Sequence, residues 1–149
     1  MPQSLSQIYV QLVFSTKERA RLISSAVQPE LHAYLAAALT SEHCPAIIVG
    51  GMPDHVHILF RLGRTVTLSD AAKIAKVESS KWMKREHGVP DFAWQAGYGA
   101  FSVSASNVED VTAYIREQER HHTTLTFQDE FRRLLERYHV EYNEAYVWD

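Results

Sequence analysis

The sequence predicts an α+β fold in which helices pack on an antiparallel sheet, of the ferredoxin-like or split-βαβ type. Its strand-like and helix-like segments follow in the order strand, helix, strand, strand, helix, strand, helix, helix. The second and third strands are so close in sequence that we expect them to form an antiparallel pair. The 149 residues fit one domain, and no low-complexity tract or Pro- or Gly-rich linker divides them. We therefore predict a single domain over residues 1–149.

The first half of the chain supplies three strands and one long helix. Residues 7–14 alternate polar and apolar side chains, with Ile8, Val10 and Leu12 on one side, as a half-buried strand does. Residues 29–42 repeat leucine at every fourth position, and proline is tolerated at the start of such a helix. The next segments are a short apolar strand at 46–49, a turn at 50–54 and a strand at 55–62.

The second half predicts three more helices and one more strand. A long helix over 68–87 is ended by Gly88 and Pro90, and residues 91–99, which contain aromatics and glycines, form a loop. The last strand is expected at 100–104. Asn107 is expected to cap a helix that runs through about residue 121. The final helix, over 126–138, opens with a capping box in which Thr126 is followed by Asp129 or Glu130.

Composition excludes several classes of protein. Cys44 is the only cysteine, which excludes an internal disulfide and a multi-cysteine zinc cluster and fits a reducing cytoplasm. The N-terminus has no signal-peptide character, and apolar stretches such as 34–39 are too short to span a bilayer. We therefore expect a cytoplasmic protein with no membrane partner. The net charge of −3 argues mildly against a protein that coats nucleic acid.

Charged side chains are distributed unevenly along the chain. Basic residues cluster in 73–85 and again near Arg116 and Arg120, whereas acidic residues gather in 130–149. The asymmetry fits one basic face and an acidic C-terminal end. It also fits ordinary solvated helix faces, and charge alone favours this second interpretation.

His55 and His57 are the first candidates for chemistry. Side chains two apart on a strand share a face, so this His-x-His pair can hold one divalent metal between two imidazoles. Val56 and Ile58 would then point the other way, into a core. Two histidines leave coordination positions open for a third ligand and a substrate oxygen, as a catalytic metal requires. Taken alone, the pattern is more typical of ordinary strand residues.

Tyr114 and Gln118 are the second candidates. They are four residues apart on a predicted helix and therefore share a face. A tyrosine hydroxyl can act as a covalent nucleophile once a metal or base favours the phenolate, and an amide oxygen can bind a hard cation. In isolation the segment is better explained as an amphipathic helix whose tyrosine half-buries its ring. Residues 94–101 are a third feature: their aromatics could stack on unpaired bases, but core aromatics beside turn glycines are more common.

Taken together, these segments resemble the single-tyrosine HUH transposases, the IS200-like enzymes that move insertion sequences as single-stranded DNA. Residues 50–57 (GGMPDHVH) resemble the HUH motif, residues 94–104 the family's next block, and residues 114–122 its nucleophile helix. Residues 127–131 and the closing 146–148 resemble its C-terminal signature. Each block is weak alone, but their occurrence in this order across nearly the whole chain is specific. The segment 76–81 departs from the pattern because it is less basic than expected and lacks a glycine.

The resemblance implies a ferredoxin-like (RRM-like) core and one Mg²⁺ or Mn²⁺ ion per site. His55 and His57 match the family's metal-binding histidines, Gln118 its third metal ligand and Tyr114 its nucleophile, which forms a 5′-phosphotyrosine. The implied partners are single-stranded DNA with hairpin ends and a second copy of the chain. In such a homodimer the tyrosine of one subunit can complete the metal site of the other. The motifs do not fix the residues that contact DNA.

Other functions remain open at this stage. Related HUH endonucleases, such as relaxases and replication initiators, usually carry extra domains for which this chain has no room. A domesticated relative that acts on chromosomal palindromes would share the same chemistry. An RNA-binding module of the same shape would need an aromatic RNP motif, and none is found. A metal-dependent hydrolase of small substrates would bind the metal but form no tyrosine adduct.

Overall fold

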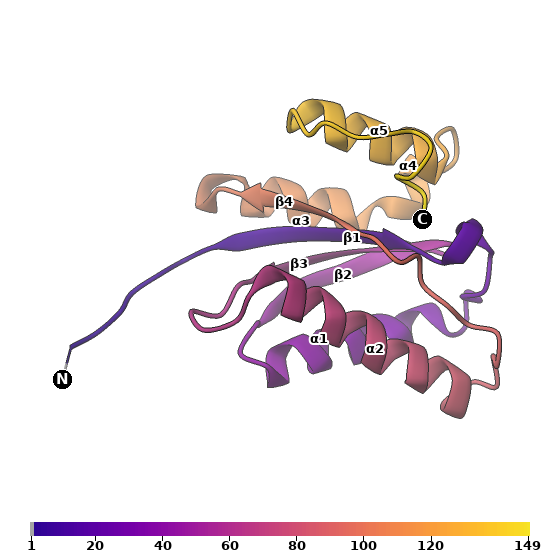
Figure 1. The fold of residues 1–149 in the computed structure, drawn as a ribbon, viewed down its shortest axis with the longest axis horizontal. Coiled ribbons are helices and arrows are strands. Elements are labelled where there is room, and N and C mark those ends of the chain that lie inside the picture. Colours follow the sequence, from indigo (N-terminus) through magenta and orange to yellow (C-terminus); the bar gives the residue numbers. More distant parts are fainter. Residues whose placement is uncertain (1) are drawn as a thin grey trace.

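The computed structural model, which describes residues 2–149, contains a four-stranded antiparallel sheet between two layers of helices (Figure 1). The strands lie in the order β2-β3-β1-β4, and each neighbouring pair is antiparallel. Their bounds are β1 Tyr9–Ser15, β2 Ala46–Met52, β3 His55–Arg61 and β4 Gly99–Val103. With one helix after β1 and one after β3, this is the βαββαβ topology of the ferredoxin-like fold. The predicted fold class is therefore confirmed.

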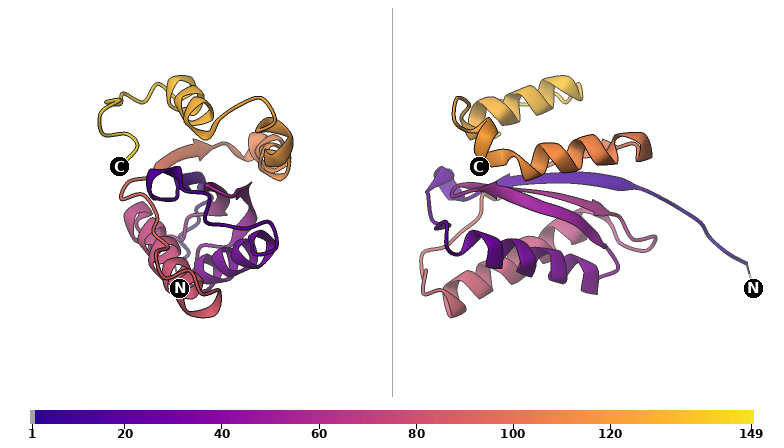
Figure 2. Two further views of the ribbon diagram at one scale, coloured as in Figure 1. Left: turned by 90° about the vertical axis from the view of Figure 1, so that its right-hand side faces the viewer. Right: turned by 180° about the vertical axis from the view of Figure 1, so that it is seen from behind.

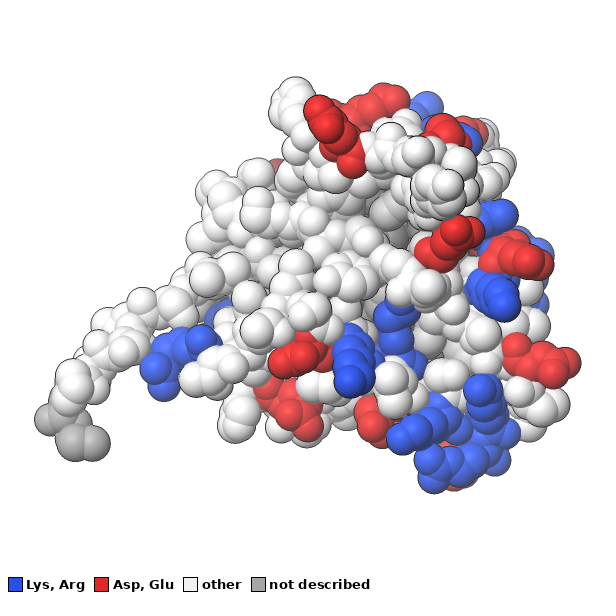
Figure 3. All heavy atoms as spheres, viewed as in Figure 1, with Lys and Arg blue, Asp and Glu red and all other residues white. Residues whose placement is uncertain are grey.

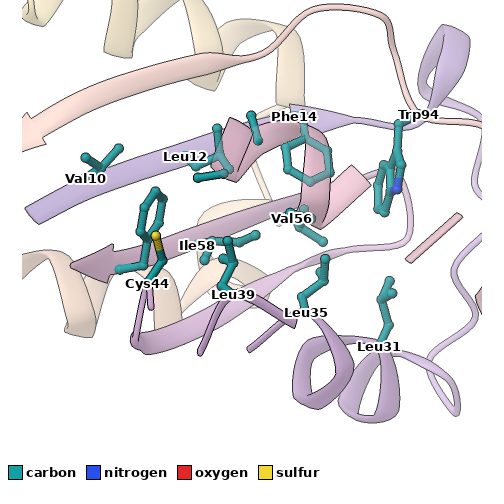
Figure 4. Close-up of a cluster of buried hydrophobic side chains, with 14 of the residues drawn as sticks. Val10, Leu12, Phe14, Leu31, Leu35, Leu39, Cys44, Val56, Ile58 and Trp94 are labelled. Atoms are coloured by element: carbon teal, nitrogen blue, oxygen red, sulfur yellow. The ribbon is translucent and has the colours of Figure 1, made fainter. Parts of the chain in front are cut away.

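Helices α1 (Gln28–Ser41) and α2 (Leu68–Glu86) cover one face of the sheet. The predicted leucine repeat of α1, at Leu31, Leu35 and Leu39, is fully buried against side chains of β1 and β3. Figure 4 shows this core between the strands and α1. Val56 and Ile58 point into it, as predicted for the strand that carries the histidines.

The opposite face is covered by α3 (Val108–Arg116), α4 (Gln118–His121) and α5 (Phe127–Arg137) (Figure 2). Short 3-10 turns, η1 at Lys17–Arg19 and η2 at Ala105–Asn107, precede α1 and α3. Helix α5 packs Phe127, Phe131, Leu134 and Leu135 against Val13 and Phe101 of the sheet. Half of the predicted capping box is present: the Thr126 hydroxyl accepts a hydrogen bond from the Asp129 amide at 3.2 Å.

Three details of the sequence prediction are wrong or need revision. The helix expected from Asn107 to about residue 121 breaks at Glu117, which separates α3 from α4. Asn107 precedes α3, but its side chain makes no capping hydrogen bond. Residues 50–52, expected in a turn, belong to β2, so the turn is only Pro53-Asp54.

Gly50 and Gly51 pair with β3, and both are glycines because neighbouring backbone leaves no room for a side chain. A Cβ on Gly50 would lie 2.5 Å from the carbonyl oxygen of Ile115 in α3, and one on Gly51 would lie 2.2 Å from that of His55. The glycines therefore mark close packing, which a sequence pattern cannot distinguish from a flexible turn. Helix α3 consequently lies directly on the strand that pairs with the histidine strand.

Charged side chains of both signs occupy the visible surface. Figure 3 shows Lys and Arg side chains gathered over the end of α2 and acidic side chains over α5 and its neighbourhood. Among residues 2–149 no helix is long and apolar enough to cross a membrane.

Candidate active site

His55 and His57 lie side by side on β3 and face the layer formed by α3, α4 and α5. Both are completely buried, and their ring centroids are 5.3 Å apart. The prediction that they share one face is confirmed. A strand supplies this arrangement because alternate residues project to the same side.

The outer nitrogen of each imidazole has a protein partner. His55 Nδ1 lies 2.7 Å from Asp54 Oδ1, and the Gln11 amide nitrogen lies 3.1 Å from His57 Nδ1. Because the Asp54 carboxylate can only accept, Nδ1 of His55 carries the proton, and in the neutral ring the Nε2 lone pair faces the site. This is how metal-binding histidines are usually held. If the Gln11 amide is rotated by half a turn, its oxygen accepts a hydrogen bond from His57 Nδ1. The Nε2 lone pair of a neutral His57 then faces the site as well.

Tyr114 and Gln118 reach the same place from α3 and α4. The Tyr114 ring lies 5.9 Å from that of His57, between centroids, and Gln118 Oε1 is 2.9 Å from His55 Nε2. All four residues predicted from the sequence are therefore brought together within one chain. The break at Glu117 does not separate the last two, since both side chains still turn toward the sheet. Sharing of the site between two subunits stays a prediction.

Glu130 and His122 complete the cluster. The sequence motifs assign neither of them a role in the active site. Glu130 Oε1 lies 2.9 Å from His57 Nε2, 3.1 Å from His122 Nε2 and 3.4 Å from His55 Nε2. Its Oε2 accepts hydrogen bonds from the Gln118 amide at 2.9 Å and from the Tyr114 hydroxyl. His122 donates through Nδ1 to the Leu125 carbonyl at 2.6 Å, so its Nε2 also faces the site.

One signal in the sequence pointed to Glu130. It lies three residues after Phe127 and four before Leu134, on the apolar stripe of α5, and only 1% of it is exposed. A carboxylate on a buried apolar face is costly unless charged or hydrogen-bonding groups meet it there. The stripe therefore implied a partner cluster under α5, although not which residues form it.

The electrostatics of the cluster are dominated by the Glu130 carboxylate. Burial alone would raise its pKa, but the charges and hydrogen bonds of the three histidines outweigh burial and hold the pKa well below its usual range. Burial likewise opposes protonation of His55, yet hydrogen bonds to Asp54 and Glu130 raise its pKa to about 9. The pKa of His57 is lowered, mainly by burial.

The same environment disfavours ionisation of Tyr114. Burial raises the pKa of its phenol far above the ordinary value, and the adjacent Glu130 charge raises it further. In this environment the hydroxyl is a poor nucleophile. A cation bound beside it would reverse the effect of that negative charge on the phenolate.

The donor atoms fit a divalent cation. In neutral rings the lone pairs of His55 Nε2 and His122 Nε2 would face two oxygens that also accept, so either protons or a metal must lie between these atoms. Ligands about 2.1 Å from an octahedral ion lie about 3.0 Å from their neighbours. The separations of Gln118 Oε1 from His55 and His122, 2.9 and 3.2 Å, and those around Glu130 match that spacing. Ligand atoms of His55, His122 and Glu130 all lie within 4.8 Å of one another, and this group does not include His57.

The family described as "Transposase IS200 like" matches residues 4–118. The chain belongs to this transposase family. The resemblance drawn from the HUH motif is thereby confirmed. The matched segment contains His55, His57, Tyr114 and Gln118, and it ends before His122 and Glu130.

Two solved structures have the same fold as this IS200-like chain. A candidate transposase from Deinococcus radiodurans R1 is 23% identical, with a TM-score of 0.60, over 79% of this chain and 98% of its own. A REP-associated tyrosine transposase bound to a REP hairpin is 11% identical, with a TM-score of 0.60, over 84% of this chain and 76% of its own. A search of curated proteins gave no match.

Proposed function

We propose that this transposase cleaves and rejoins single-stranded DNA at the ends of an insertion sequence, with Tyr114 as the nucleophile. The observation that carries the proposal is the contact of the Tyr114 hydroxyl with a buried cluster of His, Gln and Glu side chains. A tyrosine on an ordinary amphipathic helix would have no reason to lie beside such a cluster.

His55, His57 and Gln118 are proposed to hold one Mg²⁺ or Mn²⁺ ion. Their donor set, two imidazole nitrogens and an amide oxygen, is compatible with either cation. When bound, the ion would offset negative charge on the phosphate oxygens and on the phenolate. Asp54 would keep the His55 lone pair directed toward it.

The proposed step replaces one phosphate ester by another. The Tyr114 oxygen attacks phosphorus in line with the bond to the 3′ oxygen, and the phenol proton is lost. That P–O bond breaks, the 3′ oxygen takes up a proton, and the 5′ phosphate stays on Tyr114. A second 3′-hydroxyl can attack the phosphotyrosine and reverse the exchange. Because one ester replaces another, no ATP is required.

The buried position of the cluster favours rejoining over hydrolysis. His55 and His57 are 0% exposed and Gln118 is 1% exposed, so bulk water has little access to a phosphotyrosine formed there.

DNA with hairpin ends is the proposed partner, together with a second copy of the chain. Family membership supports the first, as does the shared fold with a REP-associated transposase that was solved with a REP hairpin. The homodimer, with active sites shared between subunits, is proposed from the family resemblance alone.

Tyr114→Phe tests the proposal directly. A single strand labelled at its 3′ end is incubated with the protein and Mg²⁺, and covalent adducts are separated on a denaturing gel. The wild type should retain the label, and Tyr114→Phe should not. Tyr146→Phe is the matched control, because Tyr146 is 70% exposed and distant in sequence from the cluster. An adduct formed by Tyr114→Phe would show that the nucleophile is another residue.

Substitution of the histidines tests the metal site separately. His55→Ala and His57→Ala should abolish the adduct while circular dichroism still shows a folded protein. A metal-dependent hydrolase would give a different result. It would cleave the strand only when both histidines are present, but no label would be bound to the protein at any time.

A further inference from the structure

We infer that Glu130 is a further metal ligand and the residue that orients both Gln118 and Tyr114 in the site. The inference rests on the proposed function and extends it, because it assigns to α5 a part in the metal centre. Glu130 and its neighbour in the cluster, His122, lie beyond the segment matched by the family, 4–118.

The two carboxylate oxygens of Glu130 face different partners. Oε1 lies 3.1 Å from His122 Nε2 and 3.4 Å from His55 Nε2, and these three ligand atoms lie close enough together to surround one cation. His57 Nε2 is 2.9 Å from the same oxygen but is not part of that group. Oε2 lies on the other side and accepts hydrogen bonds from Gln118 and Tyr114. Oε1 would therefore bind the metal, and Oε2 would hold Gln118 and Tyr114 beside it.

The orientation of Gln118 depends on Glu130. The oxygen and nitrogen of an amide have nearly the same shape, so only their hydrogen-bond partners decide which end faces the metal. The Gln118 nitrogen donates to Glu130 Oε2, and this turns Oε1 toward His55 Nε2 at 2.9 Å. Without an acceptor at that place, the amide could turn its nitrogen, which cannot bind a cation, into the site.

Tyr114 is fixed by the same oxygen. Its hydroxyl donates to Glu130 Oε2, which places the phenol oxygen one hydrogen bond from a metal-ligating carboxylate. The ring is also held by stacking on His121, with centroids 4.5 Å apart. Nucleophile and third ligand thus share one acceptor, so a change at Glu130 disturbs both.

The carboxylate also alters the charge of the centre. Two imidazoles and an amide leave a divalent ion with its full charge of +2, whereas Glu130 reduces it to +1 and supplies the oxygen that hard cations prefer. The site can tolerate this buried charge because the three histidines, Gln118 and Tyr114 face it, and the packing of α5 holds it there. Phe127 and Phe131, on either side of Glu130, are each 3% exposed.

Mn²⁺ binding to the full chain without DNA tests the inference apart from catalysis. Free Mn²⁺ is measured by electron paramagnetic resonance in titrations of the wild type, Glu130→Gln and Glu130→Asp. We expect Glu130→Gln to weaken binding at least tenfold and Glu130→Asp, which keeps the charge, to recover part of the loss. At saturating Mn²⁺ the adduct rate of Glu130→Gln should still be at least tenfold lower, because an amide that turns its one oxygen toward the metal turns its NH₂ group toward Gln118 and Tyr114 and cannot accept from them.

Two control variants separate this role from a structural one. Glu136→Gln removes an exposed carboxylate from the same helix and should bind Mn²⁺ as the wild type does. Leu135→Ala loosens the packing of α5 without touching the cluster, so it should lower the melting temperature but leave Mn²⁺ affinity within twofold. If Glu130→Gln does not fold, Glu130→Asp decides: affinity and adduct rate both equal to wild type would overturn the inference.

The remaining outcomes are also distinct. Unchanged Mn²⁺ affinity in a folded Glu130→Gln would refute Glu130 as a ligand. A faster adduct in that variant would show that Glu130 obstructs the site instead of organising it. If the wild type itself binds no Mn²⁺, the proposed metal chemistry fails, and the fault lies with the proposed function.

Discussion

Gly50→Ala should displace Tyr114 from the metal site, although Gly50 itself lies outside the cluster. Gly50 lies in β2, where its Cα is paired with that of His57 in β3. A Cβ there would lie 2.5 Å from the Ile115 carbonyl oxygen and 2.9 Å from the Ile115 Cγ2. Ile115 follows Tyr114 directly in α3, so the added methyl group presses on the helix that carries the nucleophile.

The size of the effect follows from this contact. Ordinary van der Waals contact begins at 3.4 Å, so the methyl group requires α3 and β2 to separate by about 0.9 Å, or 3.4 minus 2.5. Overpacking of this kind typically costs about 1–3 kcal/mol of folding stability. A misplacement of about 1 Å between reacting groups can lower a rate on the order of 100-fold. We therefore expect a folded, destabilised protein with a much slower adduct-forming step.

The assay combines urea denaturation with the rate of adduct formation on a 3′-labelled strand. Gly88→Ala is the control, because Gly88 has a φ of +63° and a Cβ there meets nothing within 4 Å. It should cost about 1–2 kcal/mol for the left-handed backbone but leave the rate unchanged. Equal adduct rates for the two folded variants would refute the idea that close packing of α3 on β2 positions Tyr114.

Three further predictions concern titratable groups. Asp54→Asn should weaken Mn²⁺ binding about 10–100-fold, since it removes the carboxylate that orients His55; calorimetry checks this. Mn²⁺ affinity should rise up to about tenfold per pH unit from pH 6.5 to about 9, because the ion must displace the proton of His55, whose pKa is about 9; titrations at several pH values check this. Burial lowers the pKa of His32 to about 4, so its neutral form stabilises the fold above pH 6.5. That stability, up to about 3 kcal/mol, is lost as pH falls toward 4, and His32→Gln should flatten this part of the pH profile in urea denaturation.

Much of the fold could be predicted because local patterns and tertiary packing agree there. The leucine repeat of α1 and the N-cap of Thr126 are signals that depend on a few neighbouring residues, and the structure retains both. The prediction was wrong where a distant contact decides. Gly50 has the sequence character of a turn residue, but the reason for its small size is a carbonyl of α3, 65 positions later in the chain.

Trp94 shows the same limit in the aromatic segment 94–101. The sequence left open whether it stacks on bases or belongs to the core. In the structure its ring packs edge-on against Phe14, with centroids 4.7 Å apart, and its indole nitrogen donates to Ser79 at 2.9 Å. Trp94 is only 8% exposed and is therefore part of the core, whereas Tyr98 of the same segment is 38% exposed.

The candidate site was predictable only as far as its residues lie in short motifs. His55 and His57 are two positions apart on β3, and Tyr114 and Gln118 are four apart around the break at Glu117. Strand and helix periodicity could therefore place each pair on one face. Glu130 is 12 positions from Gln118 and 73 from His57, and only the packing of α5 on the sheet brings it to them. Its burial must be offset by the same histidines that the sequence assigned to the metal. Either a bound ion or protons on those histidines can offset the Glu130 charge. Because Tyr114 donates to the same carboxylate, metal binding, protonation of the histidines and the position of Tyr114 are linked.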